Sequence, residues 1–358
     1  MKFWVGLLVC FACFGSIFGQ TTAPKYSNDF LKIGVGAAAA GMGNAQVAFA
    51  KDATAGYWNP AALMHSTKAP QVALMHSEYF AGIAKYDYGA FATRIQGNRH
   101  FAASFIRIGI DDIPNTLNLR DGNSFNYDRI TSFSVADMAL LVSYAQDLEF
   151  LEGLSVGGNV KIINRITGKF ATAWGFGIDL ALHYQREKLK LGLVLNDVTT
   201  TFNAWSFNTE TFEEAFRVTG NAIPQNSIEL TLPSARMGAA YSFFPEKKIN
   251  LTAAADLDWY FDGKRNSIIS LGAATIDPKI GLETTYKNLV FLRAGAMNFQ
   301  RVPDIDGKKR LNLFPTLGAG LQFKGVRIDY ALANIGDFKQ NLFSHLFSLQ
   351  FIIDKSLY

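Results

Sequence analysis

The chain has 358 residues, of which 13% are aromatic and only 18% are charged, and its formal net charge is +4 at pH 7. This small charge is spread along the chain without a basic tract, which argues against a nucleic-acid partner. Both cysteines, Cys10 and Cys13, lie near the N-terminus, so the rest of the chain contains no disulfides or thiolate ligands.

The N-terminus has the pattern of a secretory signal peptide. Lys2 is followed by an apolar or small run from Phe3 to Gly19, and export signals share this charged start and apolar centre. We therefore expect residues 1–20 to direct export and to be removed. Lipid attachment at Cys13 is a weaker alternative, because the residues before it are bulky.

Residues 21–70 form the next unit, and they show no strand-like alternation. The segment is rich in Gly and Ala, and glycine permits tight turns and close backbone approach. Asn59 before Pro60 predicts the N-cap and first turn of a short helix. We expect a compact plug or hatch, with this motif: Gly34, Gly36, Gly41, Met42, Gly43, Asp52, Trp58, Asn59, Pro60 and Ala61.

The run GVGAAA at 34–39 also matches a loose dinucleotide-binding fingerprint, with Asp52 about where a ribose ligand is sought. That interpretation requires a βαβ unit, and none follows. We therefore expect no cofactor.

Residues 71–358 alternate with period two. In WGFGIDLALHY, Trp174–Tyr184, one face is apolar with aromatic residues at both ends, as membrane barrels place them. Ten steps of about 3.3 Å, tilted by about 40°, rise roughly 25 Å, which is the height of the apolar band. The expected strands are near 71–79, 83–95, 99–110, 132–146, 154–165, 173–184, 188–196, 233–244, 249–260, 279–286, 289–298, 313–324, 326–334 and 342–353.

This pattern predicts an all-β fold, a transmembrane antiparallel β-barrel of about 14 strands in the outer membrane. The strand count is even, as in single-chain bacterial barrels. After residue 20, no apolar stretch approaches the roughly 18 residues of a membrane helix.

The connections between these strands alternate in length, as barrels with short periplasmic turns and long outer loops require. The short set is 96–99, 147–153, 185–188, 245–248, 286–288 and 324–325. The mostly longer set is 111–131, 166–172, 197–232, 261–278, 299–312 and 335–341. Within 261–278, the run SIISLGAATI from residue 267 either extends the strand expected at 279–286 or belongs to the loop. Five aromatic residues in one long loop are candidate partner anchors, although they could equally cover a lipid entry site or pack on the rim: Phe202, Trp205, Phe207, Phe212 and Phe216.

Charged residues of both signs recur on the face expected to point away from lipid. On the lipid face, bases would cost about 2–4 kcal/mol each at mid-membrane. The inward charges form either a polar binding site or ion path or, as we favour, a salt-bridge belt around the plug: Arg236, Asp256, Asp258, Glu283, Arg293, Arg327 and Asp329.

Catalytic and metal-binding motifs are not evident. The five histidines are scattered without metal-ligand spacing, and no G-x-S-x-G elbow occurs. We expect a protein that is not an enzyme and binds no metal.

The N-terminal run FLKIGVGAAAAGMGNAQVAFAKDATAGYWNPAALM resembles the signature of the PorV/PorQ family of outer-membrane proteins of Bacteroidota, which are similar to the fatty-acid channel FadL. The Gly-Met-Gly, Asp-Ala-Thr-Ala and Trp-Asn-Pro-Ala steps occur together and in order. LPSARMGAAYSF, LVFLRAGAMNF, PTLGAGLQFKGVRIDYALANIG and HLFSLQF look like the closing strands of that family. The resemblance implies a fourteen-stranded barrel with an N-terminal hatch.

Two functions follow from this resemblance. The favoured one is an accessory or shuttle of type IX protein secretion, whose partners would be a large translocon barrel and cargo with C-terminal sorting domains. The alternative is a FadL-like channel that takes up hydrophobic small molecules such as long-chain fatty acids. The inward positions are mainly Gly, Ala, Ser and charged residues, which favours a filled lumen and hence the first function. Outer-membrane lipid surrounds the barrel in both.

Overall fold

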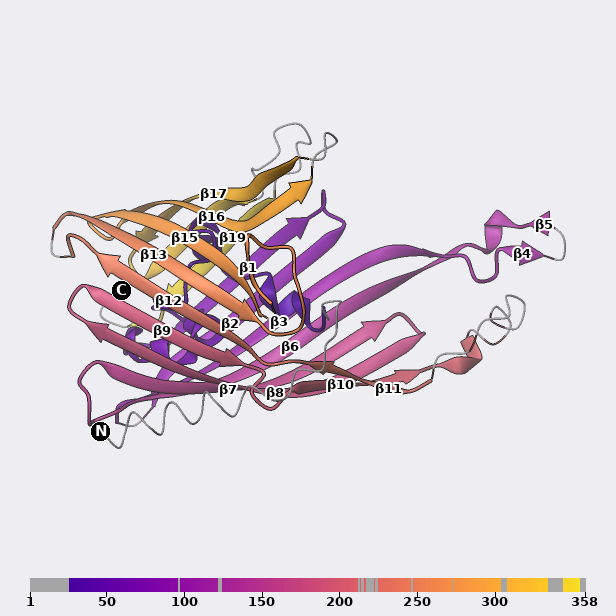
Figure 1. Ribbon diagram of the computed structural model, residues 1–358, viewed down its shortest axis with the longest axis horizontal. Helices are drawn as coiled ribbons and strands as arrows, with labels where there is room; N and C mark the ends of the chain where they lie inside the picture. The colour runs from indigo at the N-terminus through magenta and orange to yellow at the C-terminus, as the bar shows by residue number, and fades with distance from the viewer. Residues whose placement is uncertain are drawn as a thin grey trace.

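The computed structural model describes residues 26–95, 97–121, 124–211, 213, 216, 222, 225–245, 247–272, 274–303, 308–333 and 344–354. The expected signal peptide therefore lies outside the described residues. The described chain forms a barrel of antiparallel strands with the N-terminal segment inside it (Figure 1).

Fourteen strands pair with their neighbours around the barrel, and the pairing of β1 with β19 closes it. This confirms the predicted fold class. In order around the wall they are β1 (Gln71–Tyr79), β2 (Ala84–Ile95), β3 (Arg99–Asn115), β6 (Thr131–Asp147), β7 (Leu154–Thr167), β8 (Ala171–Arg186), β9 (Leu189–Asn196), β12 (Ser234–Ser242), β13 (Ile249–Tyr260), β15 (Ala274–Tyr286), β16 (Val290–Pro303), β17 (Lys309–Phe323), β18 (Val326–Ala333) and β19 (Ser344–Ile352).

Five further strands lie between the predicted barrel strands. They are β4 (Arg120–Asp121), β5 (Ser124–Phe125), β10 (Thr201–Phe207), β11 (Ser227–Thr231) and β14 (Ile269–Leu271). Four of them fall in stretches that the sequence predicted to be loops, so these loop assignments are wrong in part, and the fifth, β14, falls in the run 267–276, which the sequence left open as strand or loop. The physical reason is long-range pairing: β10 hydrogen-bonds to the outer part of β8, beyond the end of β9, and β11 pairs with β10. The β3–β6 pair and the β10–β11 pair extend beyond the rest of the wall at the same end of the barrel (Figure 1).

The two faces of the wall differ in chemistry, as the period of two requires. On β8, Trp174, Phe176 and Leu180 point outward and are about half exposed, whereas Asp179 and His183 point inward and are buried. An apolar outer surface of this kind is typical of barrel strands that face lipid.

The N-terminal segment (residues 26–70) occupies the lumen. It contains four short helices, η2 (Asp29–Lys32), α2 (Ala37–Gly41), α3 (Ala55–Trp58) and η3 (Pro60–His65), and η4 (Tyr127–Arg129) and η5 (Thr209–Thr211) lie in outer connections. No helix in the described part of the chain is both long and apolar enough to cross a membrane.

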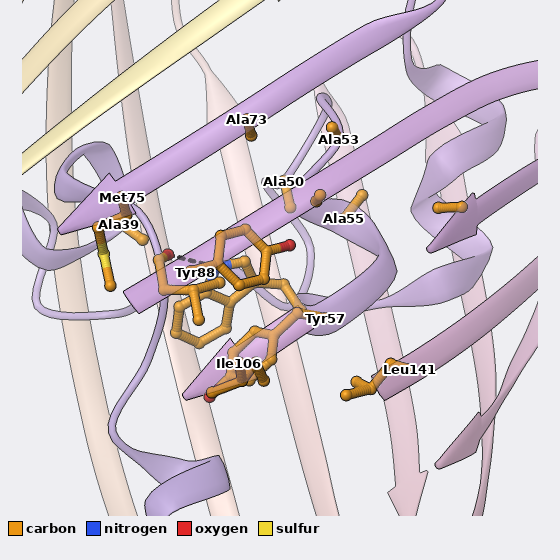
Figure 2. Close-up of a cluster of buried hydrophobic side chains, with 14 of the residues drawn as sticks. Ala39, Ala50, Ala53, Ala55, Tyr57, Ala73, Met75, Tyr88, Ile106 and Leu141 are labelled. Atoms are coloured by element: carbon orange, nitrogen blue, oxygen red, sulfur yellow. Dashed lines mark hydrogen bonds between the residues drawn. The ribbon is translucent and has the colours of Figure 1, made fainter. Parts of the chain in front are cut away.

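The main hydrophobic core lies between this segment and the inner wall (Figure 2). Small residues of the segment, among them Ala39, Ala53 and Ala55, pack with Tyr57 against wall side chains such as Tyr88 and Leu141. The barrel therefore buries apolar groups inside as well as presenting them to lipid outside.

Candidate functional site

The interface between the N-terminal segment and the barrel wall is the candidate site, and it begins with the stretch GYWNPAALM. The Asn59 side chain is fully buried, and its Oδ1 accepts a hydrogen bond of 3.0 Å from the amide of Ala61. Its Nδ2 donates to the carbonyls of Val47, at 2.9 Å, and of Leu182 in β8, at 3.1 Å. One side chain thus caps η3 and joins two parts of the segment to the wall.

Tyr57 and Trp58 hold the same segment together from within. The Tyr57 hydroxyl donates to the carbonyl of Leu31 at 2.7 Å and accepts from the amide of Gly34 at 3.2 Å. Trp58 Nε1 donates to the carbonyl of Val35 at 3.0 Å, and the two rings meet edge to face, 4.9 Å apart. Burial raises the pKa of Tyr57, so its hydroxyl remains a proton donor.

Glycines allow the segment to touch the wall backbone. An added Cβ at Gly157 of β7 would lie 2.5 Å from the amide nitrogen of Ala61, and one at Gly295 of β16 would lie 2.3 Å from that of Gly43. Met42, fully buried, is held against Gly281 and Gly295. Side chains at these wall positions would push the segment away.

The remaining glycines of the predicted motif shape the segment itself. Gly34 and Gly36 have φ angles of 98° and 88°, in the region that favours glycine. Gly41 lies against Gly318 of β17, where an added Cβ would be 2.9 Å from the Gly318 Cα.

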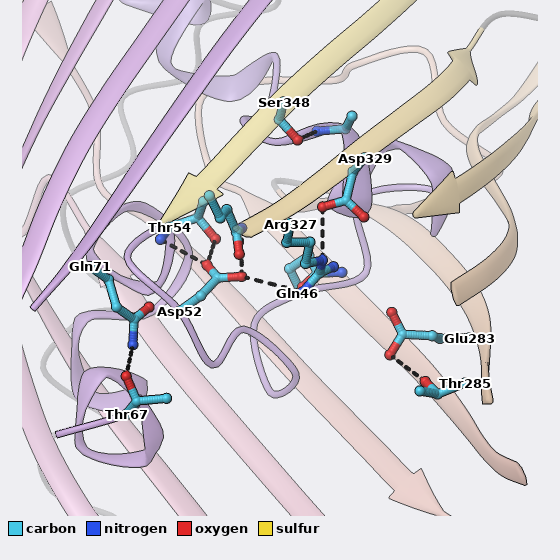
Figure 3. Close-up of polar contacts among 12 residues, drawn as sticks. Gln46, Asp52, Thr54, Thr67, Gln71, Glu283, Thr285, Arg327, Asp329 and Ser348 are labelled. Atoms are coloured by element: carbon cyan, nitrogen blue, oxygen red, sulfur yellow. Dashed lines mark hydrogen bonds and ion pairs between the residues drawn. The ribbon is translucent and has the colours of Figure 1, made fainter. Parts of the chain in front are cut away.

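A chain of ion pairs crosses one side of the lumen, and Figure 3 shows the part of it that joins Asp52, Arg327 and Asp329. Arg293 Nε lies 2.7 Å from Glu283 Oε2, and its Nη1 lies 2.8 Å from Asp329 Oδ1. Arg327 Nε lies 2.8 Å from Asp329 Oδ2, and its Nη1 lies 3.9 Å from Asp52 in the N-terminal segment. Asp52 also accepts a 2.8 Å hydrogen bond from Gln350 and bonds from the amide and hydroxyl of Thr54, at 2.9 Å and 2.6 Å.

The other three charges of the predicted belt have different partners. Asp256 Oδ2 accepts the backbone amides of Gln46 and Val47, at 2.6 Å and 2.8 Å, so this wall carboxylate binds the segment directly. Asp258 pairs with Lys279, which sequence reasoning missed.

Arg236, like Asp256, forms no ion pair within the described part of the chain. Its Nη2 donates instead to Asn196 Oδ1, at 3.1 Å, and to the carbonyl of Tyr57, at 3.3 Å. Its guanidinium group lies 5.9 Å from the centre of the Tyr57 ring and 6.0 Å from that of Trp58.

Two further polar groups were missed by sequence reasoning. Lys161 of β7 lies 2.8 Å from Asp179 Oδ1 of β8 and also pairs with Asp197, all three being buried. The alternation of residues 174–184 predicts that Asp179 points inward, but its pairing with Lys161 depends on the register between β7 and β8. Near the short turns, the His65 and His183 rings lie 4.6 Å apart, and burial, with a contribution from His183, lowers the pKa of His65 to about 3.

Two small cavities lie between described residues of the segment and of the wall. The larger, of about 50 Å³, is lined by Tyr57, Trp58, Tyr260 and Arg236, among others. The second, of about 20 Å³, lies beside Arg293 and Arg327. A cavity of roughly 10–15 Å³ is enough for one water molecule, whereas pockets that bind small-molecule ligands are far larger. These cavities therefore hold only a few waters while the segment is in place.

The described candidate partner anchors have different surroundings. Phe202 points outward beside Phe176, with ring centres 6.3 Å apart, whereas Trp205 donates to Glu229 at 2.8 Å and stacks with Phe207. Phe216 is half-buried, and Phe212 lies outside the described residues. Their role in binding a partner stays a prediction.

The fold is similar to those of solved bacterial channels. TodX, the toluene transporter of Pseudomonas putida, matches with a TM-score of 0.56 at 15% identity, over 88% of this chain and 96% of its own. TbuX, the toluene transporter of Ralstonia pickettii, has a TM-score of 0.53 at 14% identity, over 89% and 98%. The monoaromatic hydrocarbon channel CymD has a TM-score of 0.54 at 14% identity, over 89% and 98%.

No protein-family model matches the chain, and a search of curated proteins finds no match. The structural likenesses confirm the FadL-like barrel fold, and at these identities they establish the fold alone. They give no specific support to PorV/PorQ membership, to a source in Bacteroidota or to a role in type IX secretion. The three solved proteins are named as transporters or channels rather than as enzymes.

Proposed function

We propose that this chain is an outer-membrane channel for small hydrophobic molecules, and that its N-terminal segment, residues 26–70, acts as a movable plug. A solute would enter the lumen from one side of the outer membrane and leave after the plug has shifted. The charged residues between plug and wall would hold the closed state.

The observation that carries this proposal is a wide barrel whose lumen is filled by its own N-terminal segment. An eight-stranded barrel is about as wide as wall side chains can fill, and fourteen strands enclose considerably more space. Here the wall faces the lumen with Gly157, Gly281 and Gly295, and the segment occupies the space they leave. A barrel needed only as a rigid support would require neither this space nor a separate element to fill it.

The contacts between segment and wall favour a reversible closure. They are hydrogen bonds and ion pairs from Asp256, Arg327 and Ser155, together with small apolar contacts, and none is covalent. The likeness to TodX, TbuX and CymD over nearly their whole lengths supports a hydrophobic solute. The secretion role expected from the sequence has no such support.

Uptake by intact cells tests the proposal. The protein is produced in a bacterial host that has an outer membrane but lacks its own channel for hydrophobic compounds. Uptake of radiolabelled toluene and of a radiolabelled long-chain fatty acid is then measured. We expect faster uptake of at least one of them than in cells carrying an empty vector. If neither compound is taken up faster than by cells carrying the empty vector, the proposed function is overturned. Co-purification of a large barrel or of secreted proteins would favour the secretion role.

A disulfide lock tests the plug. A Cβ atom at Gly56 would lie 2.9 Å from Ser143 Oγ of β6, within reach of a disulfide. The pair Gly56→Cys with Ser143→Cys should block uptake when oxidised and restore it when reduced. The matched control joins two wall strands, Ser242→Cys with Thr252→Cys, whose native side-chain oxygens are 3.1 Å apart. Full uptake through the oxidised lock would show that the plug does not gate the channel.

A further inference from the structure

The outward face of the first three wall strands carries charged side chains. On β1, β2 and β3, six ionisable side chains point away from the lumen and remain between 33% and 57% exposed. They lie on one hairpin and on the strand beside it, and we call them the charged patch: His76, Glu78, Lys85, Asp87, Arg107 and Asp111.

This charged patch reaches the depth of the apolar band. Because the short turns share one side of the membrane, the distance from a short turn along a strand indicates depth. Asp87 lies eight residues from the short-turn end of β2, and Arg107 lies eight residues from that of β3. At the same distance, β8 and β13 present Ile178 and Leu257 to lipid, and β8 stays apolar as far as Trp174. Bases that face hydrocarbon at mid-membrane cost about 2–4 kcal/mol each, so we expect another surface to cover these charges.

Opposite charges stand side by side in the patch. In one row across the strands, Asp87 is flanked by His76 and Arg107, and in the next row Glu78 opposes Lys85. His76 Nδ1 lies 2.7 Å from Asp87 Oδ1, whereas Arg107 Nη1 lies 3.7 Å from Asp87 Oδ2. These contacts orient the charges but leave each side chain partly exposed, so every one of them retains room for a further partner.

The balance of charges favours a second copy of this chain over an anionic lipid headgroup. The patch has three carboxylates, Glu78, Asp87 and Asp111, against two permanent cations, Lys85 and Arg107. It therefore offers phosphate groups no excess of positive charge. In a two-fold symmetric interface both partners present the same surface, and a surface on which the signs alternate can be complementary to itself.

The surface beside the charges also suits close contact. Gly89 opposes Leu74 in the next row of the same hairpin, and Leu74 is 46% exposed. An added Cβ at Gly89 would meet nothing nearer than Leu74 Cδ2, at 3.7 Å, so the outward side of Gly89 is open. In membranes, small residues and polar pairs hold neighbouring elements together, because lipid is as apolar as the side chains. A projecting Leu74 beside an open Gly89 provides such a contact.

We propose that the outward face of β1–β3 binds a second copy of this chain, so that the barrel is a two-fold symmetric dimer in the outer membrane. Acids and bases of the charged patch would pair across the interface and be removed from lipid. This inference goes beyond the proposed channel function and does not depend on it, since each barrel keeps its own lumen and its own N-terminal segment.

Chemical cross-linking in the membrane tests the dimer. In a chain with Cys10→Ser and Cys13→Ser, a single cysteine is placed beside the patch by Gly89→Cys, or on the outward face of β8 by the matched control Leu180→Cys, where Leu180 is 50% exposed. Outer membranes of the producing cells are treated with a short bismaleimide, and heat-modifiable gel mobility confirms that each barrel is folded. We expect several-fold more covalent dimer from Gly89→Cys than from Leu180→Cys.

Charge variants of the Gly89→Cys chain test the role of the patch. Asp87→Lys leaves three bases side by side in one row and should lower the yield of dimer several-fold. The control Asp128→Lys makes the same change of charge on the exposed η4 and should leave the yield unchanged. Arg107→Glu alone should also lower the yield, whereas co-producing it with Asp87→Lys on differently tagged chains should restore cross-linking between the two.

The dimer is overturned if Gly89→Cys cross-links no more than Leu180→Cys, or if Asp87→Lys leaves the yield unchanged. It is also overturned if the cysteine at position 89 is cross-linked to a different protein instead, or if the wild type is recovered as a monomer with lipopolysaccharide. Solute uptake enters none of these measurements, so failure of the channel function and failure of the dimer are distinguishable.

Discussion

Replacing Arg293 by Met should destabilise the barrel more than any single exposed charge does. The Arg293 guanidinium has no solvent exposure and contacts two buried carboxylates, Glu283 at 2.7 Å and Asp329 at 2.8 Å. Methionine keeps much of the volume but removes the charge and every donor.

The magnitude follows from what is left behind. Asp329 retains Arg327 at 2.8 Å, so the loss falls mainly on Glu283. Glu283 keeps a 3.4 Å hydrogen bond from Thr285 and the longer-range attraction of Lys51 and Arg327. Leaving one buried charge without its partner costs about 3–5 kcal/mol. Adding Glu283→Gln removes that charge and should recover most of the loss, because a neutral amide has a much smaller desolvation cost.

Urea unfolding in lipid vesicles, followed by tryptophan fluorescence, measures the free energy of unfolding. Arg165→Met is the matched control, because Arg165 also pairs with two carboxylates, Asp137 and Glu229, but is 21% exposed. It should cost only about 1 kcal/mol, as partly exposed pairs do. The reasoning is refuted if Arg293→Met costs no more than the control, or if Glu283→Gln fails to restore stability in the double variant.

Three other predictions concern the N-terminal segment. Gly157→Ala forces a Cβ to 2.5 Å from the Ala61 amide nitrogen, so it should lower the free energy of unfolding by about 1–3 kcal/mol and make the segment more accessible to protease. The control Gly89→Ala, whose nearest contact would be 3.7 Å away, should have neither effect. Asn59→Ala removes a helix cap and leaves the carbonyls of Val47 and Leu182 without this donor, so it should lower the free energy of unfolding by about 2–4 kcal/mol in the same urea titration. A decrease smaller than the roughly 1 kcal/mol expected for loss of a helix cap alone would contradict this prediction. Burial lowers the pKa of His65 to about 3, so between pH 6.5 and 3 this residue binds more protons in the unfolded chain than in the folded one. The free energy of unfolding should therefore fall by about 1 kcal/mol between pH 6.5 and pH 5.5. His65→Gln should flatten this dependence of stability on pH, and an unchanged dependence would argue against a neutral, buried His65.

The barrel itself could be predicted from the sequence because its determinants are local. Side chains alternate between faces with period two, so the apolar and small residues of Trp174–Tyr184 identify the outer and inner faces of β8 without knowledge of its neighbours. Short polar turns then separate the strands, and the Asn59–Pro60 step predicts the start of η3, where the structure places it.

Partnerships across the lumen depended on the tertiary structure, because register is a property of two strands and not of one. Alternation shows that Asp256 points inward, but only the packed barrel brings it to the amides of Gln46 and Val47. In the same way, β10 was expected to be a loop because its strand conformation depends on pairing with β8. The sequence thus determined which residues face lipid and which face the lumen, while closure of the barrel decided which charges meet.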